Sequence, residues 1–118
     1  MDEGDALMEC LFCRILAGEV PATVVAETER TVAFRDVAPQ APTHLLVVPR
    51  DHHADVAACA AADPGLLADV LAAAVDVARA QGLDGGYRLL TNTGPDAGQT
   101  VHHLHVHVLG GRALGALG

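Results

Sequence analysis

The sequence contains no lysine, and its seven basic residues are arginines scattered along 118 residues that carry a net charge of −8. Without lysine the chain has no amine that can form a Schiff base or act as a lysyl nucleophile. Without a cluster of arginines it has no basic stripe along a nucleic-acid backbone, which argues against polymeric DNA or RNA as a ligand. A small phosphate ester remains open as a ligand, because backbone N–H groups of a glycine-rich turn bind phosphate without net positive charge.

Long apolar runs are also missing, although hydrophobic residues make up 51% of the chain. No run approaches the length that crosses a bilayer. The N-terminus, Met1 to Asp5, is acidic, unlike the positively charged start of a secretory leader. We therefore expect a soluble, cytoplasmic protein without a membrane partner. Its length predicts one domain, 1–118, with flexible tails at 1–8 and 113–118.

Cysteine is scarce, and its odd count includes one C-x-x-C pair, Cys10 and Cys13, besides Cys59. Such a pair in a chain without a leader indicates a reduced compartment and metal or redox use. No βαβ pattern surrounds it, which disfavours a thioredoxin-like role. Two thiolates need two further ligands for a closed tetrahedral zinc site, and histidines can supply them. Packed thiols are the alternative.

Hydrophobic periodicity predicts a short helix over 9–17 and a long helix over 63–81, the latter with Asp63 as N-cap and Pro64 at its first position. Strands are expected at 23–27, 31–35, 44–48, 87–92 and 103–108. Hairpins with a single crossover helix predict an α+β fold. It consists of a five-stranded, mainly antiparallel sheet with one long and one short helix.

Histidines recur at every second position of the last predicted strand, as His103, His105 and His107. Because successive side chains of a strand point to opposite faces, the three imidazoles should share one face. A polar strand face can be purely structural, but imidazole titrates near neutrality and binds metals. The row therefore predicts either three metal ligands or an acid, base and nucleophile set acting on phosphorus or a carbonyl group.

The surroundings of the row carry a more specific pattern. A glycine-rich loop at 92–100 precedes it, and Leu109-Gly110-Gly111-Arg112 follows it. This resembles the histidine-triad family of nucleotide hydrolases and transferases, and the ending looks like its Hint branch. The resemblance runs from about Glu9 to Arg112. It departs at 113–118, where Hint-like members of animals carry a longer tail with an aromatic residue near the site.

The resemblance implies that His105 forms a covalent nucleotidyl intermediate, with His103 and His107 as supporting residues. His107 would lie beside the phosphate and the leaving group. The residues themselves favour the middle imidazole as the nucleophile, because mutual repulsion disfavours charging all three rings and neighbouring groups can fix its tautomer.

The resemblance further implies a nucleotide site, in which an acidic residue binds ribose hydroxyls and apolar residues wall the base. Taken alone, Asp36 after a strand is often a turn former, and a glycine turn needs no ligand. In the family, the loop before the triad contacts phosphate or the triad itself. The candidate nucleotide- and phosphate-binding residues are Asn92, Gly98, Gln99, Thr100, Asp36, Leu11, Phe12 and Val37.

Family members that keep the C-x-x-C pair can bind structural zinc with two histidines, one on the central strand and one in the triad. By this resemblance the ligands would be Cys10, Cys13, His44 and His103. The metal would orient the triad, and neither metal catalysis nor an organic cofactor is expected. His52 and His53 fit a surface turn.

The predicted function is hydrolysis of nucleotidyl P–N or P–O bonds, with purine nucleoside 5′-phosphoramidates as the favoured substrates, as in adenosine 5′-monophosphoramidases. Two alternatives stay open. One is a non-catalytic purine nucleotide-binding or adaptor protein, and the other is a diadenosine polyphosphate hydrolase or nucleotidyl transferase. By resemblance the chain should form a homodimer through its long helix and a strand.

Overall fold

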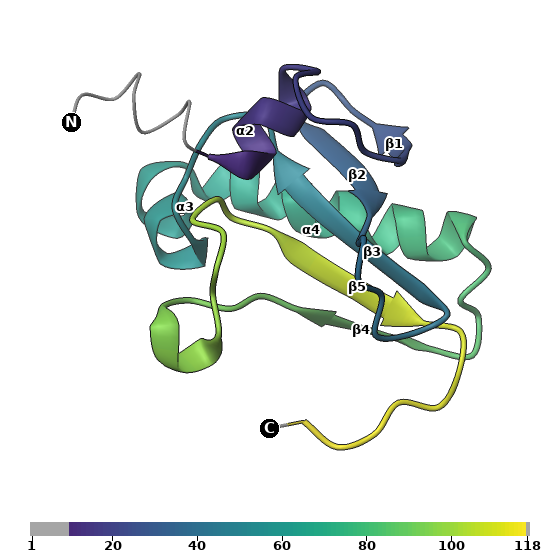
Figure 1. The fold of residues 1–118 in the computed structure, drawn as a ribbon. Coiled ribbons are helices and arrows are strands. Elements are labelled where there is room, and N and C mark those ends of the chain that lie inside the picture. The colour runs from purple at the N-terminus through teal and green to yellow at the C-terminus, as the bar shows by residue number, and fades with distance from the viewer. Residues whose placement is uncertain (1–9, 118) are drawn as a thin grey trace.

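A computed structural model describes residues 10–117 (Figure 1). The elements in chain order are α2 (Leu11–Leu16), β1 (Val24–Glu27), β2 (Thr31–Arg35), β3 (Thr43–Pro49), α3 (Val56–Ala62), α4 (Pro64–Ala80), β4 (Tyr87–Leu90), the 3-10 turn η1 (Pro95–Ala97) and β5 (Val106–Gly110). The predicted tail at 1–8 lies outside the described residues. Of the described helices, none combines the length and the apolarity that a membrane span requires.

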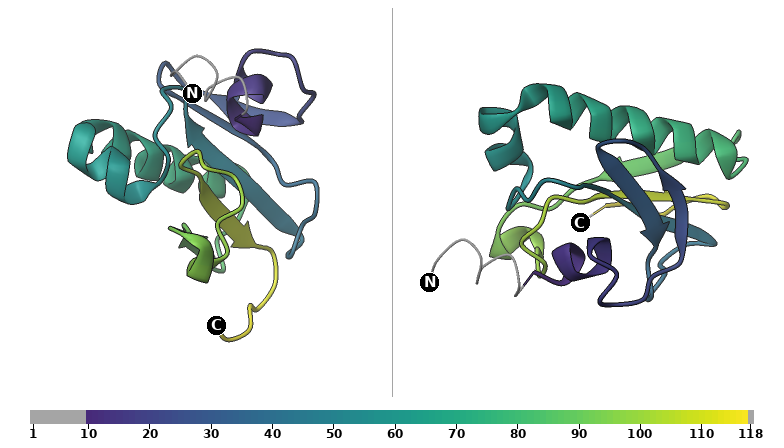
Figure 2. Two further views of the ribbon diagram at one scale, coloured as in Figure 1. Left: turned by 60° about the vertical axis from the view of Figure 1, so that its left-hand side comes forward. Right: turned by 90° about the horizontal axis from the view of Figure 1, so that it is seen from above.

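The five strands form one antiparallel sheet in the order β1-β2-β3-β5-β4. The long helix α4 packs across one face of the sheet and the short helix α2 lies on the other, as the view from above in Figure 2 shows. The predicted α+β fold is thereby confirmed. Strand β3 is central, and the triad strand β5 is its neighbour.

Helix α4 begins as its sequence predicts. The Asp63 side chain accepts a hydrogen bond from the N–H of Leu66, and Pro64 occupies the first turn, where a missing N–H costs nothing. The helix buries one stripe, Leu66, Val70, Ala74, Val77 and Ala78. Much of that stripe packs on β3 and β5, and each fully buried valine or leucine contributes about 1.5–3 kcal/mol to stability.

Strand β3 is buried on both faces because its apolar residues are continuous. Leu45 and Val47 face the cluster around α4, whereas Leu46 and Val48 join the cluster around α2. In the second cluster, Phe12 of α2 meets Phe34 of β2 edge-on, with ring centroids 5.5 Å apart. This contact holds α2 over the sheet beside the triad.

Helix α3 was not predicted. Its sequence is alanine-rich and buries only Cys59, so it has no apolar stripe wide enough to indicate a helix. The Asp55 side chain caps it by accepting a hydrogen bond from the N–H of Ala58 at 2.8 Å. Helices α3 and α4 meet at Asp63, which ends the first and begins the second.

The triad strand is shorter than predicted, since β5 begins at Val106 and not at residue 103. Ahead of it, the N–H of Leu104 pairs with the carbonyl of His53, and the Thr91 hydroxyl donates to the carbonyl of His105. These bonds tie residues 103–105 to neighbouring loops in place of the sheet ladder. Both faces of this segment are buried.

Candidate active site

The nucleophile candidate, His105, has its tautomer fixed by the main chain. Its Nδ1 lies 2.7 Å from the carbonyl oxygen of His103. A carbonyl can only accept, so Nδ1 carries the proton and Nε2 keeps a lone pair. Burial lowers the pKa of His105, which keeps the ring neutral near pH 7. The edge of Phe12 packs against it, with ring centroids 4.9 Å apart.

His107 has the opposite tautomer, set by a chain of two hydrogen bonds. The main-chain N–H of Gln40 donates to Nδ1 of His44 at 3.0 Å, so the His44 proton is on Nε2. That nitrogen lies 2.9 Å from Nδ1 of His107 and donates to it. His107 therefore carries its proton on Nε2, and this atom is buried with no hydrogen-bond partner in the described part of the chain.

The charge state of His107 suits a hydrogen-bond donor at Nε2. Burial first, and then the neighbouring His105 and His44, lower its pKa to about 4. A neutral imidazole with a proton on Nε2 is a hydrogen-bond donor. The rings of His105 and His107 have centroids 5.0 Å apart. An imidazole lone pair thus lies beside an N–H donor, an arrangement suited to attack on phosphorus with donation to a phosphoryl oxygen.

A cavity of about 480 Å³ opens beside these two histidines. Such a volume lies in the range of small-ligand sites. Apolar residues of α2, β2 and β3 line it, together with residues of the loop before the triad. The lining residues are Leu11, Phe12, Ile15, Val20, Pro21, Ala22, Phe34, Arg35, Asp36, Val37, Leu46, Thr100, Val101, His105 and His107. The four predicted wall and ribose residues, Leu11, Phe12, Asp36 and Val37, are among them.

Asp36 follows β2 and combines a turn with a place in the cavity wall. Its Oδ1 accepts the N–H of Ala38 at 2.9 Å, as in an Asx turn. Its Oδ2 lies 3.4 Å from Nε2 of His44. The structural and the ligand-binding interpretations of this residue are therefore compatible.

Of the four residues predicted to bind phosphate in the loop before the triad, Thr100 is the one that lines the cavity. The side chain of Gln99 is held by hydrogen bonds to main-chain groups. Its Nε2 donates to the carbonyls of Ala54 and Val101, and its Oε1 accepts the N–H of Gly94. Its own N–H donates to the carbonyl of Gly94, and Gly98 donates its N–H to Pro95. Thr100 lines the cavity, whereas Asn92, Gly98 and Gln99 do not. Gln99 shapes the loop and has no free donor for a phosphate.

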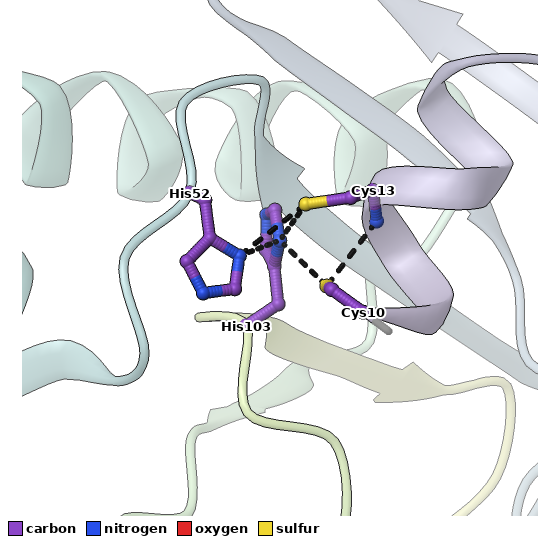
Figure 3. Close-up of side chains that lie close together, drawn as sticks. All are labelled: Cys10, Cys13, His52 and His103. Atoms are coloured by element: carbon purple, nitrogen blue, oxygen red, sulfur yellow. Dashed lines mark hydrogen bonds between the residues drawn. The ribbon is translucent and has the colours of Figure 1, made fainter. Parts of the chain in front are cut away.

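A second group of side chains gathers between α2 and the loops after β3 and before β5 (Figure 3). Sγ of Cys10 lies 3.4 Å from Nδ1 of His103, and Sγ of Cys13 lies 3.3 Å from Nδ1 of His52. All four ligand atoms lie within 4.8 Å of one another. Two thiols and two imidazoles at this spacing match the ligand set of a structural zinc site.

The protonation of His103 also fits a metal ligand. Its Nε2 donates to the carbonyl of Pro49 at 2.9 Å, which directs the lone pair of Nδ1 toward the two sulfurs. An imidazole ligand typically donates its other N–H to such a carbonyl. Burial, and then the hydrogen bond and charge of Cys10, raise the pKa of Cys13 to about 12. A bound cation would favour the thiolate form of Cys13 and so lower this raised pKa.

The prediction of His44 as the fourth member of this group is wrong. His44 is near the start of β3, where it contacts Asp36 and His107, while the cysteines face the loop after Pro49. Five residues of strand separate those positions by about 16 Å. His52, predicted to lie in a surface turn, takes the place.

The chain is similar to known proteins over most of its length. Residues 17–114 match the model of the HIT domain. An uncharacterised HIT-like protein of Synechococcus elongatus is 46% identical, with 90% of this chain and 93% of that protein covered. A solved HIT family hydrolase from Clostridium thermocellum is 44% identical with a TM-score of 0.87, covering 92% of this chain and 96% of that chain. The 14 kDa zinc-binding protein of Zea mays is 43% identical, with 88% and 83% covered.

The matched regions cover nearly all of the described fold. They include strand β5, with His107 on it and His103 and His105 just before it. The chain belongs to the HIT domain family, and the matched region contains His103, His105 and His107.

Proposed function

We propose that this protein hydrolyses nucleotidyl P–N or P–O bonds, with purine nucleoside 5′-phosphoramidates as its substrates. The observation that carries the proposal is the pair of opposite tautomers: an Nε2 lone pair on His105 beside an unpartnered Nε2–H on His107. The similarity to a HIT family hydrolase supports a hydrolytic function.

The reaction proceeds in two steps on phosphorus. Nε2 of His105 attacks, so that a P–N(His105) bond forms and the bond to the leaving nitrogen breaks. The leaving nitrogen takes that electron pair and one proton from solvent. Water then gives its hydroxyl group to phosphorus and returns one proton to solvent, which releases the nucleoside monophosphate and frees His105. His107 donates to the phosphoryl group throughout, where charge accumulates.

The cavity orients the nucleotide for this attack. Asp36 accepts hydrogen bonds from the ribose hydroxyls, while Leu11, Phe12 and Val37 pack against the base. Thr100, on the phosphate side, is the loop residue left to contact the phosphate. This placement assigns Asp36 and Thr100 to different parts of the substrate.

A structural zinc ion would be held by Cys10, Cys13, His52 and His103. Its chemistry when bound is that of a closed tetrahedral centre, which fixes ligand positions and offers no open coordination site. His103 contributes its side chain to this group and its carbonyl to His105. The likeness to a plant zinc-binding protein supports the assignment.

We also propose a homodimer that pairs through α4 and the edge strand β4. The free edge of β4 carries the half-exposed Tyr87, and α4 exposes Leu71. The edge of a sheet is a ready surface for pairing with a second chain.

The test of function is release of AMP from adenosine 5′-phosphoramidate by the purified protein and by His105→Ala. We expect turnover by the wild type alone, and a mass increase of one nucleotidyl group on the wild type in rapidly quenched samples. The matched control is His102→Ala, an exposed histidine outside the site. Equal turnover by His105→Ala refutes the mechanism, and AMP binding without turnover by the wild type refutes the hydrolase.

A further inference from the structure

His44 is not a member of the triad, yet its buried ring connects two parts of the nucleotide site. Its Nδ1 accepts the N–H of Gln40, which leaves a single N–H, on Nε2. Two acceptors face that N–H: Nδ1 of His107 at 2.9 Å and Oδ2 of Asp36 at 3.4 Å. The Nε2–H of His44 is therefore shared between the carboxylate of Asp36, on the ribose side of the site, and Nδ1 of His107, on the phosphate side.

We propose that His44 is a positioning residue that couples ribose binding at Asp36 to hydrogen-bond donation by His107 at the phosphate. The inference rests on the proposed function, because it takes Asp36 as the ribose-binding carboxylate. Its consequence is that the ribose hydroxyls contribute to the chemical step as well as to binding.

The physical basis is competition for one proton. Without ribose, the negative charge of Asp36 attracts the N–H of His44 away from His107, since the described residues offer this carboxylate one further donor, the N–H of Ala38 at Oδ1. Ribose hydroxyls that donate to Asp36 weaken this attraction. The N–H of His44 then donates fully to Nδ1 of His107. A stronger bond at Nδ1 polarises the ring and strengthens Nε2–H as a donor, because hydrogen bonds in a chain reinforce one another.

His107 is placed to use that gain. Its Nε2 is buried without a partner among the described residues, and its side chain lines the cavity beside His105. A buried donor that lacks an acceptor destabilises the free protein, so a phosphate oxygen at this point satisfies a group that the fold leaves open.

The same three side chains also lie close enough to hold a cation. The hydrogen bond from Gln40 argues against it. A metal ion on Nε2 of His44 would require loss of the remaining ring proton while Nδ1 still accepts an N–H, and neutral imidazole offers only one lone pair. A hydrogen-bonded chain is the arrangement that this ring permits.

The kinetic test compares adenosine 5′-phosphoramidate with its 2′,3′-dideoxy counterpart. For the wild type we expect kcat to fall about fivefold when the hydroxyls are removed, in addition to a rise in KM. His44→Phe should lower kcat on the ribonucleotide about tenfold or more, and the residual kcat should no longer depend on the hydroxyls. His44→Gln, whose amide can donate to His107, should recover part of the loss.

The matched control is His102→Phe, which makes the same exchange at an exposed position and should keep the wild-type sensitivity to ribose. Equal fold-losses of kcat on the dideoxy substrate in the wild type and in His44→Phe would overturn the coupling.

A second measurement needs no turnover and so separates this inference from the proposed function. Long-range ¹H–¹⁵N spectra of the imidazoles report which nitrogen carries the proton. We expect His107 to hold its proton on Nε2 in the wild type and to lose that preference in His44→Phe. The His44 ring signal should move further with AMP than with 2′,3′-dideoxy-AMP. An unchanged His107 tautomer in His44→Phe, or equal shifts with both nucleotides, would refute the inference even in a protein that cleaves phosphoramidates.

Discussion

Gln99 illustrates how a residue beside the triad can matter without touching a ligand. Its side chain makes three hydrogen bonds to main-chain groups of Gly94, Ala54 and Val101. Gln99→Met fills a similar volume but leaves these groups unpaired, so we expect a loss of about 1–3 kcal/mol in the free energy of unfolding. Urea titration measures it. If stability is unchanged and only the KM for the nucleotide rises, the residue is a phosphate ligand after all.

A second prediction at this scale concerns the pH dependence of stability that His107 confers. Its pKa of about 4 in the folded protein lies below the ordinary value of 6.5, chiefly because it is buried. As pH falls below 6.5, the unfolded chain binds a proton at this residue before the folded protein does. Folding is therefore penalised progressively from pH 6.5 to about 4, and the penalty is absent above pH 6.5.

At pH 5 the penalty from His107 amounts to about 1–2 kcal/mol. Replacing the ring with a side chain that does not titrate should remove it. We expect the difference in unfolding free energy between pH 7.5 and pH 5 to shrink by this amount in His107→Asn, as urea titrations at both pH values would measure. An undiminished difference would assign the acid sensitivity to other groups.

At the scale of elements, the cap of α3 is a separable contribution. Asp55 accepts the N–H of Ala58, and α3 has little apolar burial to compensate for losing that bond. Asp55→Ala should lower the unfolding free energy by about 1 kcal/mol. Asp84→Ala, at an exposed aspartate in the turn before β4, serves as the control and should change it by less than about 0.5 kcal/mol. Thermal unfolding followed by circular dichroism compares the two variants.

The elements also show where sequence patterns inform and where they fail. Helix α4 was predictable because its cap, its proline and its apolar periodicity all indicate a helix in the same place. Strand β3 was predictable because its apolar run is continuous. Helix α3 has a cap but no stripe, so its alanines gave no periodic signal. The start of β5 was misplaced because contacts with His53 and Thr91, distant in sequence, withdraw residues 103–105 from the ladder.

At the scale of the whole molecule, one group of side chains joins α2 to two loops that are far apart in the chain (Figure 3). Its members are Cys10, Cys13, His52 and His103. Bound zinc would stabilise the folded state, because the unfolded chain has no preformed site. We expect about one zinc per chain in protein purified without chelator, and a fall in Tm of roughly 5 °C or more on its removal. Cys13→Ser should abolish the zinc content, as metal analysis would show.

The matched control for this prediction is Cys59→Ser, since Cys59 lies outside the group and should leave the zinc content unchanged. Equal zinc content in wild type and Cys13→Ser would contradict the assignment.

The choice between His44 and His52 shows the limit of sequence spacing at this scale. The C-x-x-C pair and the triad are local patterns, and each can be found from residue types alone. Which end of β3 faces the cysteines depends on how α2 packs across the sheet, through contacts such as Phe12 with Phe34. No spacing in the chain encodes that long-range choice.

His103 gives its ring to the cysteine group and its carbonyl to His105. The cysteine group and the site of the nucleophile therefore share one residue, so a change in the first can affect the second. Replacing Cys10 and Cys13 would remove two of the four candidate ligands and leave Nδ1 of His52, 3.2 Å away, as the neighbour of Nδ1 of His103 within this group. A change at the cysteine pair would therefore reach the nucleophile through His103, although neither cysteine lines the cavity.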